Sequence, residues 1–120
     1  MDCNLIGCIA EYKFAVLAME NEINVSFPLL DASPYDCITD SINGLKKIQI
    51  KSVLSDKDVV RCYLQSSGKR YYSVNDVDYF AIWIQSHNGF YIIKNTGKLH
   101  SLVIHKEGIY SENFNNFAIL

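Results

Sequence analysis

The chain has 120 residues, of which 49 % are hydrophobic and 20 % charged, and its formal net charge is −2 at pH 7. This length fits one compact domain over residues 1–120 and leaves no room for a second core. No basic segment precedes an apolar stretch near Met1, and the apolar run from Phe14 to Met19 is bounded by charged residues, so we expect neither a signal peptide nor a membrane span.

The first predicted element is a helix from Asn4 to about Asn21, where apolar residues recur at helical spacing and no proline interrupts them. Asn24 to Pro28 follows as a short strand candidate. The turn residues from Asp31 to Pro34 predict a loop. We detect no internal repeat and no heptad pattern along the chain.

Three pairs of strand-like runs are joined by turn residues and predict β-hairpins. They are Tyr35 to Ile42 with Leu45 to Val53 around Asn43-Gly44, Arg61 to Gln65 with Tyr71 to Val74 around Ser66-Ser67-Gly68, and Phe80 to Ile84 with Phe90 to Ile93 around His87-Asn88-Gly89. The Asn-Gly pair predicts a type I′ turn in the first hairpin. Ser73 to Val77 carries capping residues and predicts a short helical turn. One helix followed by several strands indicates an α/β or α+β domain with a mixed sheet.

Charge and cysteines are unevenly placed along the chain. Residues 1–40 carry seven acids against Lys13, whereas residues 41–106 carry ten bases against four acids, so a −6 segment precedes a +6 segment. Ordinary solvated faces explain such a distribution as well as a nucleic-acid surface does. The four cysteines show no CxxC spacing and mostly adjoin apolar segments, as expected of reduced thiols in a cytoplasmic protein without a zinc site.

The first predicted hairpin brings polar side chains together. With a two-residue loop, Asp36 lies opposite Lys51 and has Gln49 as its diagonal neighbour, because alternate residues share one face. The other face then suits a core, since it carries Cys37, Thr39, Ile48 and Ile50. The alternative interpretation is an exposed cross-strand ion pair with no function.

A third acidic residue lies on the predicted helix. Glu11 projects from a largely apolar stripe, because its neighbours one turn away include Gly7, Cys8 and Phe14. An unpaired charge is costly in such surroundings. Glu11 is therefore expected to have a partner, either a metal ion or a lysine.

Three short motifs occur in an order that resembles the core of the PD-(D/E)XK nucleases. They are Gly7-xxx-Glu11, Ser33-Pro34-Tyr35-Asp36 and Ile48-Gln49-Ile50-Lys51-Ser52. Over residues 4–53 the chain looks most similar to the small homing endonucleases encoded by bacterial group I introns, and secondarily to archaeal Holliday-junction resolvases. The resemblance implies an α/β fold with a restriction-endonuclease-like core, in which helices flank a mixed β-sheet.

The resemblance also implies a role for each motif residue. Asp36 takes the place of the metal-binding aspartate, Lys51 that of the motif lysine, and Glu11 that of the helix glutamate of the resolvase-like branch. Gln49 departs from the pattern, which usually has Asp or Glu there, and a neutral amide offers an oxygen ligand but no charge. Either Glu11 restores the second negative charge, or the chain is a DNA-binding remnant without catalysis.

The residue types define the expected chemistry. Asp36, Gln49, the Ile50 carbonyl and Glu11 offer the oxygen ligands that Mg²⁺ accepts. Lys51 would orient or help to deprotonate the attacking water and offset charge on the phosphorane oxygens. We therefore expect Mg²⁺-dependent hydrolysis of double-stranded DNA at Glu11, Asp36, Gln49 and Lys51, and the resemblance implies a 5′-phosphate product.

DNA contacts are predicted in the basic hairpin between Arg61 and Val74. Its candidate residues are Arg61, Gln65, Lys69 and Arg70, because a two-stranded ribbon fits the major groove. A solvated turn is the alternative. A chain this short has one active site and cannot cut both strands alone, so a homo-oligomer, either a dimer or a tetramer, is expected. A homing endonuclease, a junction resolvase and a non-catalytic remnant all stay open as functions.

Overall fold

The computed structural model describes all 120 residues, in one α-helix, seven strands and three short 3₁₀ turns. The elements are α1 (Cys3–Glu20), β1 (Asn24–Ser26), β2 (Cys37–Ser41), β3 (Gly44–Val53), β4 (Val60–Tyr63), β5 (Tyr79–Ile84), η1 (Gln85–His87), β6 (Gly89–Lys94), β7 (Ser101–Ile104), η2 (Ser111–Asn113) and η3 (Phe117–Ile119). None of the helices has the length and apolarity needed to cross a membrane. The first helix and the strands on either side of Asn43-Gly44 lie where the sequence predicts them.

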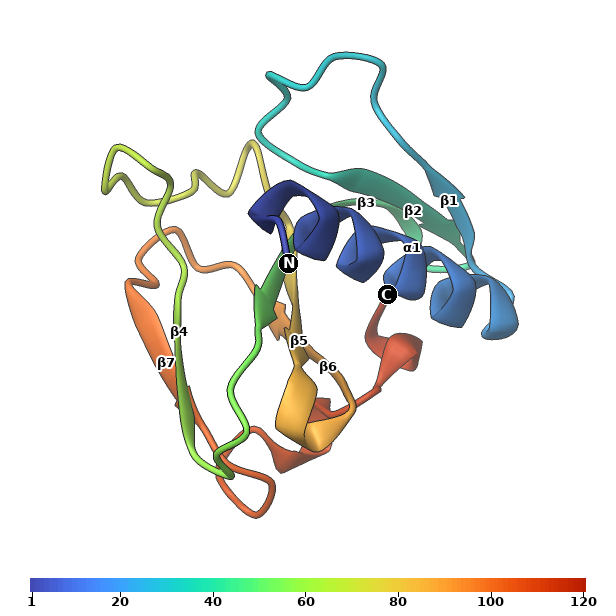
Figure 1. Ribbon diagram of the computed structural model, residues 1–120. Coiled ribbons are helices and arrows are strands. Elements are labelled where there is room, and N and C mark those ends of the chain that lie inside the picture. The colour runs from blue at the N-terminus through green and yellow to red at the C-terminus, as the bar shows by residue number, and fades with distance from the viewer.

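Five strands form a mixed sheet in the order β1-β2-β3-β5-β6, in which only β3 and β5 run parallel (Figure 1). Strands β5 and β6 are buried along nearly their whole length, which matches their continuous apolar sequence. One face of the sheet is covered by α1, and the other by a separate two-stranded sheet of β4 and β7. The predicted mixed-sheet α/β class is confirmed, but an α-helix flanks only one face.

Helix α1 is capped at its amino terminus and packs against the sheet along its inner side. The Asp2 carboxylate accepts a hydrogen bond from the Asn4 N–H at 2.7 Å and caps the amino terminus. Ala10, Phe14 and Ala18 are buried against the sheet. The small alanines let the helix approach the sheet closely, and the Phe14 ring packs edge-on against Phe90, 5.6 Å between centroids.

The β2–β3 hairpin differs from the prediction in its turn and its register. Ser41 pairs with Gly44, so the two loop residues are Ile42 and Asn43. Within this hairpin only Gly44 has positive φ, at 95°, which excludes the predicted type I′ turn. The two-residue shift keeps every side chain on its predicted face but changes which residues lie opposite one another, because side chains alternate with a period of two.

The second predicted hairpin is wrong. Strand β4 pairs with β7 instead, and only one isolated bridge, between Gln65 and Tyr71, joins the two predicted runs. The physical reason is burial: β4 and β7 both alternate buried and exposed side chains and so present one continuous apolar face to the main sheet. The β5–β6 hairpin and the single helical turn at Ser73, where the Val77 N–H bonds the Ser73 carbonyl at 3.0 Å, are confirmed.

The close packing at the start of β6 gives a first prediction. A Cβ at Gly89 would lie 2.5 Å from the Phe114 ring and 2.8 Å from Asn115 Oδ1. Gly89→Ala should therefore lower the free energy of unfolding by about 2–3 kcal/mol, measured by urea denaturation, because a packed core does not accept added volume. Gly7→Ala is the matched control, since no atom lies within 4 Å of its added Cβ. A Gly89→Ala variant as stable as the wild type would contradict this packing.

Candidate active site

Asp36 occupies an edge of β3 that β2 leaves free. Strand β3 has ten residues and β2 only five, so β3 loses its partner beyond Ile48. There the Asp36 N–H donates to the Ile48 carbonyl at 2.8 Å, and Asp36 Oδ2 accepts from the Ile50 N–H at 2.7 Å. Because the N–H and C=O of a strand residue point to the same side, the Ile50 carbonyl faces the same edge as the Asp36 carboxylate.

Glu11 and Asp36 line one cavity. Its volume is about 420 Å³, and it lies between α1 and the segment from Phe27 to Asp36. The lining residues are Cys8, Glu11, Tyr12, Phe27, Pro28, Leu30, Asp31, Ser33, Tyr35 and Asp36. Asp31 is a third carboxylate that the sequence interpretation placed in an ordinary loop.

The carboxylates around this cavity disfavour one another's ionised forms. Burial raises the pKa of Glu11, and the charges of Asp36 and Asp31 raise it further. Burial also raises the pKa of Asp36, whereas the Ile50 N–H and the Lys51 ammonium partly offset that effect. A cation bound here would relieve this repulsion.

The donor atoms fit a hard divalent cation only if amide or backbone oxygens take part. No three His, Cys, Asp or Glu side chains lie close enough to hold a metal ion by themselves. Two carboxylates and the Ile50 carbonyl are nevertheless oxygen donors of the kind that Mg²⁺ prefers, and water commonly completes its shell. Gln49 is half-buried on β3 next to Ile50.

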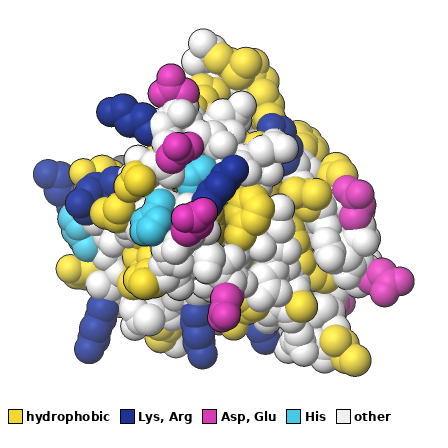
Figure 2. Space-filling view, turned by 90° about the horizontal axis from the view of Figure 1, so that it is seen from below, with side chains coloured by type: hydrophobic (Ala, Val, Ile, Leu, Met, Phe, Trp, Pro, Cys, Tyr) yellow, Lys and Arg dark blue, Asp and Glu magenta, His cyan; other side chains and the backbone are white.

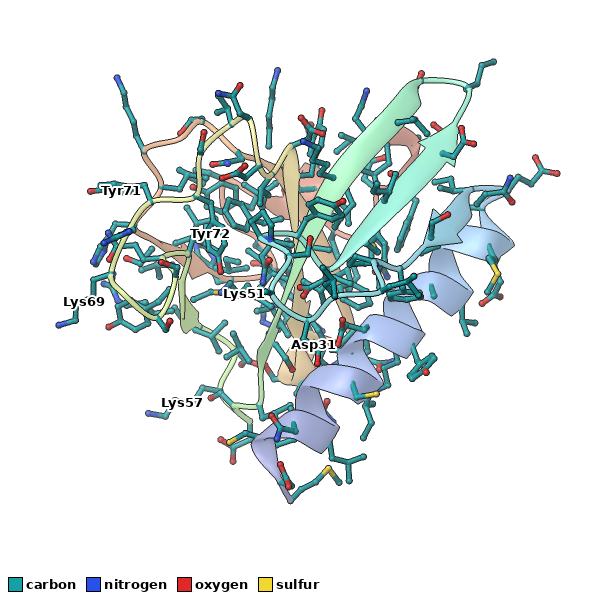
Figure 3. The ribbon with its side chains drawn as sticks, turned by 90° about the horizontal axis from the view of Figure 1, so that it is seen from above. Asp31, Lys51, Lys57, Lys69, Tyr71 and Tyr72 are labelled. Atoms are coloured by element: carbon teal, nitrogen blue, oxygen red, sulfur yellow. The ribbon has the colours of Figure 1, made fainter.

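Lys51 lies on the opposite face of β3 from Ile50, because the two are neighbours in a strand. Its Nζ donates to the Tyr72 hydroxyl at 3.2 Å and lies 5.0 Å from the centre of that ring. Figure 3 shows Lys51 and Tyr72 near the middle of the molecule, with Asp31 toward α1. The prediction that Asp36 pairs directly opposite Lys51 is wrong, since extending the observed register places Asp36 beside Gln49.

Tyr72 is held in place by a buried amide. Asn95, which is 5 % exposed, donates through Nδ2 to the Tyr72 and Val77 carbonyls at 2.9 Å each. The Tyr72 ring packs edge-on against Phe80, 5.6 Å between centroids. Sequence reasoning missed Tyr72, because it lies in an irregular segment 21 residues from the lysine that it contacts.

The predicted DNA-binding residues do not lie on a two-stranded ribbon. Lys69 and Arg70 are exposed in a turn closed by the Lys69 N–H to Ser66 carbonyl bond at 2.8 Å. Arg61 is exposed on β4 and donates to Ser101 Oγ at 2.9 Å, whereas Gln65 bridges to Tyr71.

Charged side chains lie on both of the faces that Figures 2 and 3 show. Lys69 and Tyr71 lie at the outer edge across from α1, and Lys57 lies nearer the amino-terminal end of α1 (Figure 3). Viewed from the opposite side, lysines, arginines and acidic residues are mixed (Figure 2).

A second prediction follows from the carboxylate repulsion. Glu11→Gln should raise the unfolding free energy at pH 7, because it removes a charge that burial, Asp36 and Asp31 disfavour. A raised folded-state pKa means that the stability it contributes is complete below the unfolded value of 4.5 and is lost as pH rises through the folded value. The gain of the variant should therefore be absent below about pH 4 and grow toward pH 7, reaching about 0.5 kcal/mol at most because Glu11 is partly exposed.

Urea denaturation at several pH values measures this difference. The matched control is Glu107→Gln at an exposed position, which should show no such pH dependence. A Glu11→Gln variant that loses stability toward neutral pH would show that Glu11 has a favourable partner in the folded protein.

Comparisons with known proteins identify the family and the fold of the chain. A family model described as PD-(D/E)XK endonuclease matches residues 1–118. The structure of a bacterial homing endonuclease superposes with a TM-score of 0.75 at 21 % sequence identity, covering 99 % of this chain and 93 % of that chain. Hjc, a Holliday junction resolvase from the archaeal hyperthermophile Archaeoglobus fulgidus, gives a TM-score of 0.62 at 12 % identity, covering 94 % and 93 %. No curated protein matches the sequence.

Proposed function

Because the chain belongs to the PD-(D/E)XK endonuclease family, we propose that it is a sequence-specific homing endonuclease that hydrolyses double-stranded DNA with a divalent metal ion. The observation that carries this proposal is the free edge of β3. There the Asp36 carboxylate, fixed by the Ile50 N–H, lies on the same side as the Ile50 carbonyl and shares a cavity with Glu11. The likeness to a bacterial homing endonuclease along nearly the whole chain supports the choice of activity.

Each residue of the site has a proposed role. Asp36, Glu11 and the Ile50 carbonyl would hold the metal ion, with the Gln49 amide oxygen as a further ligand. When bound, a divalent ion supplies positive charge to the scissile phosphate and lowers the pKa of water. Lys51 would orient the attacking water and offset negative charge that develops on the phosphate oxygens.

Tyr72 is proposed to position Lys51. A lysine side chain has four rotatable bonds, and ordering it costs conformational entropy. The Tyr72 hydroxyl and ring hold the ammonium near Asp36 before substrate arrives. Asn95 fixes the backbone of Tyr72, so the position of the lysine depends on a residue that does not touch the substrate.

DNA is proposed to approach the side of the molecule that carries the cavity. Lys57, Lys69 and Tyr71 lie exposed on this side, and Arg70 is exposed next to Lys69, so these side chains would contact phosphates of the duplex. Such contacts position the duplex without reading its sequence. Base recognition then comes from groups that meet the groove edges.

A junction resolvase is the second candidate, because the fold is also similar to that of an archaeal Holliday junction resolvase. The two functions differ in substrate and not in chemistry. We would incubate the protein and Mg²⁺ with a random-sequence duplex library, a four-way junction and the linear duplexes of its arms, and sequence the new ends.

The expected result is cutting at one recurring long sequence in the duplex library, with the junction and its arms uncut. Cutting confined to the junction would replace the homing proposal with the resolvase proposal. Cutting of neither substrate would contradict both.

A further inference from the structure

Helix α1 is apolar on its outer side as well as on its inner side. The outer residues Leu5, Ile9, Tyr12, Val16 and Met19 are 51, 37, 65, 50 and 56 % exposed. The rest of the chain leaves these side chains largely open to solvent, and only the Tyr12 ring has an aromatic neighbour, the Phe27 ring at 6.3 Å between centroids. A helix that is apolar on two opposite sides is expected to bury both of them, so this outer surface is expected to be covered in the working protein.

The outer residues have a spacing of four, three, four and three residues. This spacing is the seam of a helix that packs lengthwise against another helix, with side chains of one filling the spaces of the other. The pattern is hidden in the sequence because the inward residues Ala10, Phe14 and Ala18 are apolar too. It becomes visible once the buried residues are set aside.

We propose that this outer stripe of α1, from Leu5 to Met19, is the interface with a second copy of this chain, with the two α1 helices packed antiparallel about a two-fold axis. The five side chains leave roughly 500 Å² of accessible surface per chain, so two copies reach the ~1,000 Å² that a stable interface needs. Two hollows of about 270 and 550 Å³ beside the stripe, both lined by Ile9, Lys13 and Trp83, extend the apolar surface.

A second copy is the occupant that the stripe fits. The partner must present an apolar helix face of the same spacing and length, and the same stripe on another copy does so by symmetry. No charged residue interrupts the stripe, so a two-fold axis brings no like charges together within it. Two copies also supply the two active sites that a double-strand cut requires.

The antiparallel orientation rests on the proposed function. Glu11 and Cys8 lie on one flank of the stripe and line the cavity of the candidate site, whereas Lys13 lies on the other flank, 4.1 Å from the centre of the Trp83 ring. In an antiparallel pair the same flank of both helices faces the same side, whereas in a parallel pair the flanks face opposite sides. Only the antiparallel pair presents both cavities to one duplex.

Sedimentation equilibrium of the purified full chain tests the interface without any DNA. The wild type should sediment with the mass of two chains, or of a multiple of two. Val16→Asp should raise the dissociation constant of the dimer at least about 100-fold, because it buries a carboxylate in the seam. Ile42→Asp, at a fully exposed turn residue, is the matched control and should assemble as the wild type does.

Two outcomes would overturn the interface. The first is a wild type that has the mass of one chain both at the highest soluble concentration and after 100-fold dilution. The second is a folded Val16→Asp variant whose assembly is unchanged. Circular dichroism of the variant establishes that it is folded. A monomer that still cuts DNA would reject this inference and keep the proposed function. A dimer that never cuts DNA would keep this inference and reject the proposed function.

A cysteine variant tests the orientation. In a background with Cys3→Ser and Cys8→Ser, Met19→Cys places one thiol near the end of each stripe. The two thiols meet only in a parallel pair, because antiparallel packing separates them by more than about 15 Å at 1.5 Å per residue. We expect the variant to form the dimer but not to form a disulfide crosslink when it is exposed to oxidised glutathione. A disulfide-linked dimer would overturn the antiparallel arrangement.

Discussion

Replacing Asp36 with asparagine should lower the rate of DNA cleavage about 1,000-fold and leave DNA binding nearly unchanged. The asparagine oxygen can still accept the Ile50 N–H, so the edge of β3 keeps its shape. The negative charge at that edge is lost, and with it a principal attraction for the cation. Loss of metal-assisted stabilisation of several kcal/mol corresponds to about three orders of magnitude in rate.

Single-turnover cleavage with excess protein measures this effect apart from DNA affinity. Asp40→Asn is the matched control, because Asp40 lies exposed on β2 away from the cavity. The Asp36 variant should be at least as stable as the wild type, since burial disfavours the ionised carboxylate. A variant that cleaves within tenfold of the wild type would exclude Asp36 as a metal ligand.

The second large effect is expected at Lys51. Lys51→Ala removes the ammonium that lies near Asp36 and contacts Tyr72, so the cleavage step should slow about 100- to 1,000-fold. Lys57→Ala is the control, because Lys57 is exposed and should change mainly DNA affinity. Single-turnover rates at saturating protein separate an effect on the cleavage step from an effect on DNA affinity.

Tyr72→Phe distinguishes positioning from a structural role. It keeps the ring that packs against Phe80 but removes the hydroxyl that accepts from Lys51. We expect a smaller loss, about tenfold, in the cleavage step with unchanged stability. A Lys51→Ala variant with wild-type cleavage would remove the lysine, and Tyr72 with it, from the proposed site.

Local patterns made part of this structure predictable. Apolar residues at helical spacing predict α1, and the Asn43-Gly44 pair places the β2–β3 hairpin. The faces of that hairpin are also right, because alternation survives a shift of two residues. The opposing pairs are wrong because they depend on the turn, in which Ile42 and Asn43, and not Asn43 and Gly44, form the loop.

Features that depend on distant segments were not predictable. Strands β4 and β7 pair across about 40 residues, and no local turn signal connects them. Asp31 and Tyr72 reach the site from irregular segments, whose positions follow from tertiary contacts such as the Asn95 hydrogen bonds. The outer stripe of α1 could be separated from the core only after the buried side was known.

The most direct test of the central claim is cleavage of supercoiled plasmid DNA carrying a target site, by the purified wild type, in Mg²⁺ and in EDTA. The proposed function predicts nicked or linear product with 5′-phosphate ends in Mg²⁺ and none in EDTA. Product that forms equally well in EDTA would contradict a metal-dependent site at Asp36 and Glu11. A protein that binds the DNA but never cuts it in Mg²⁺ would be a binding module, in which Gln49 marks a lost active site.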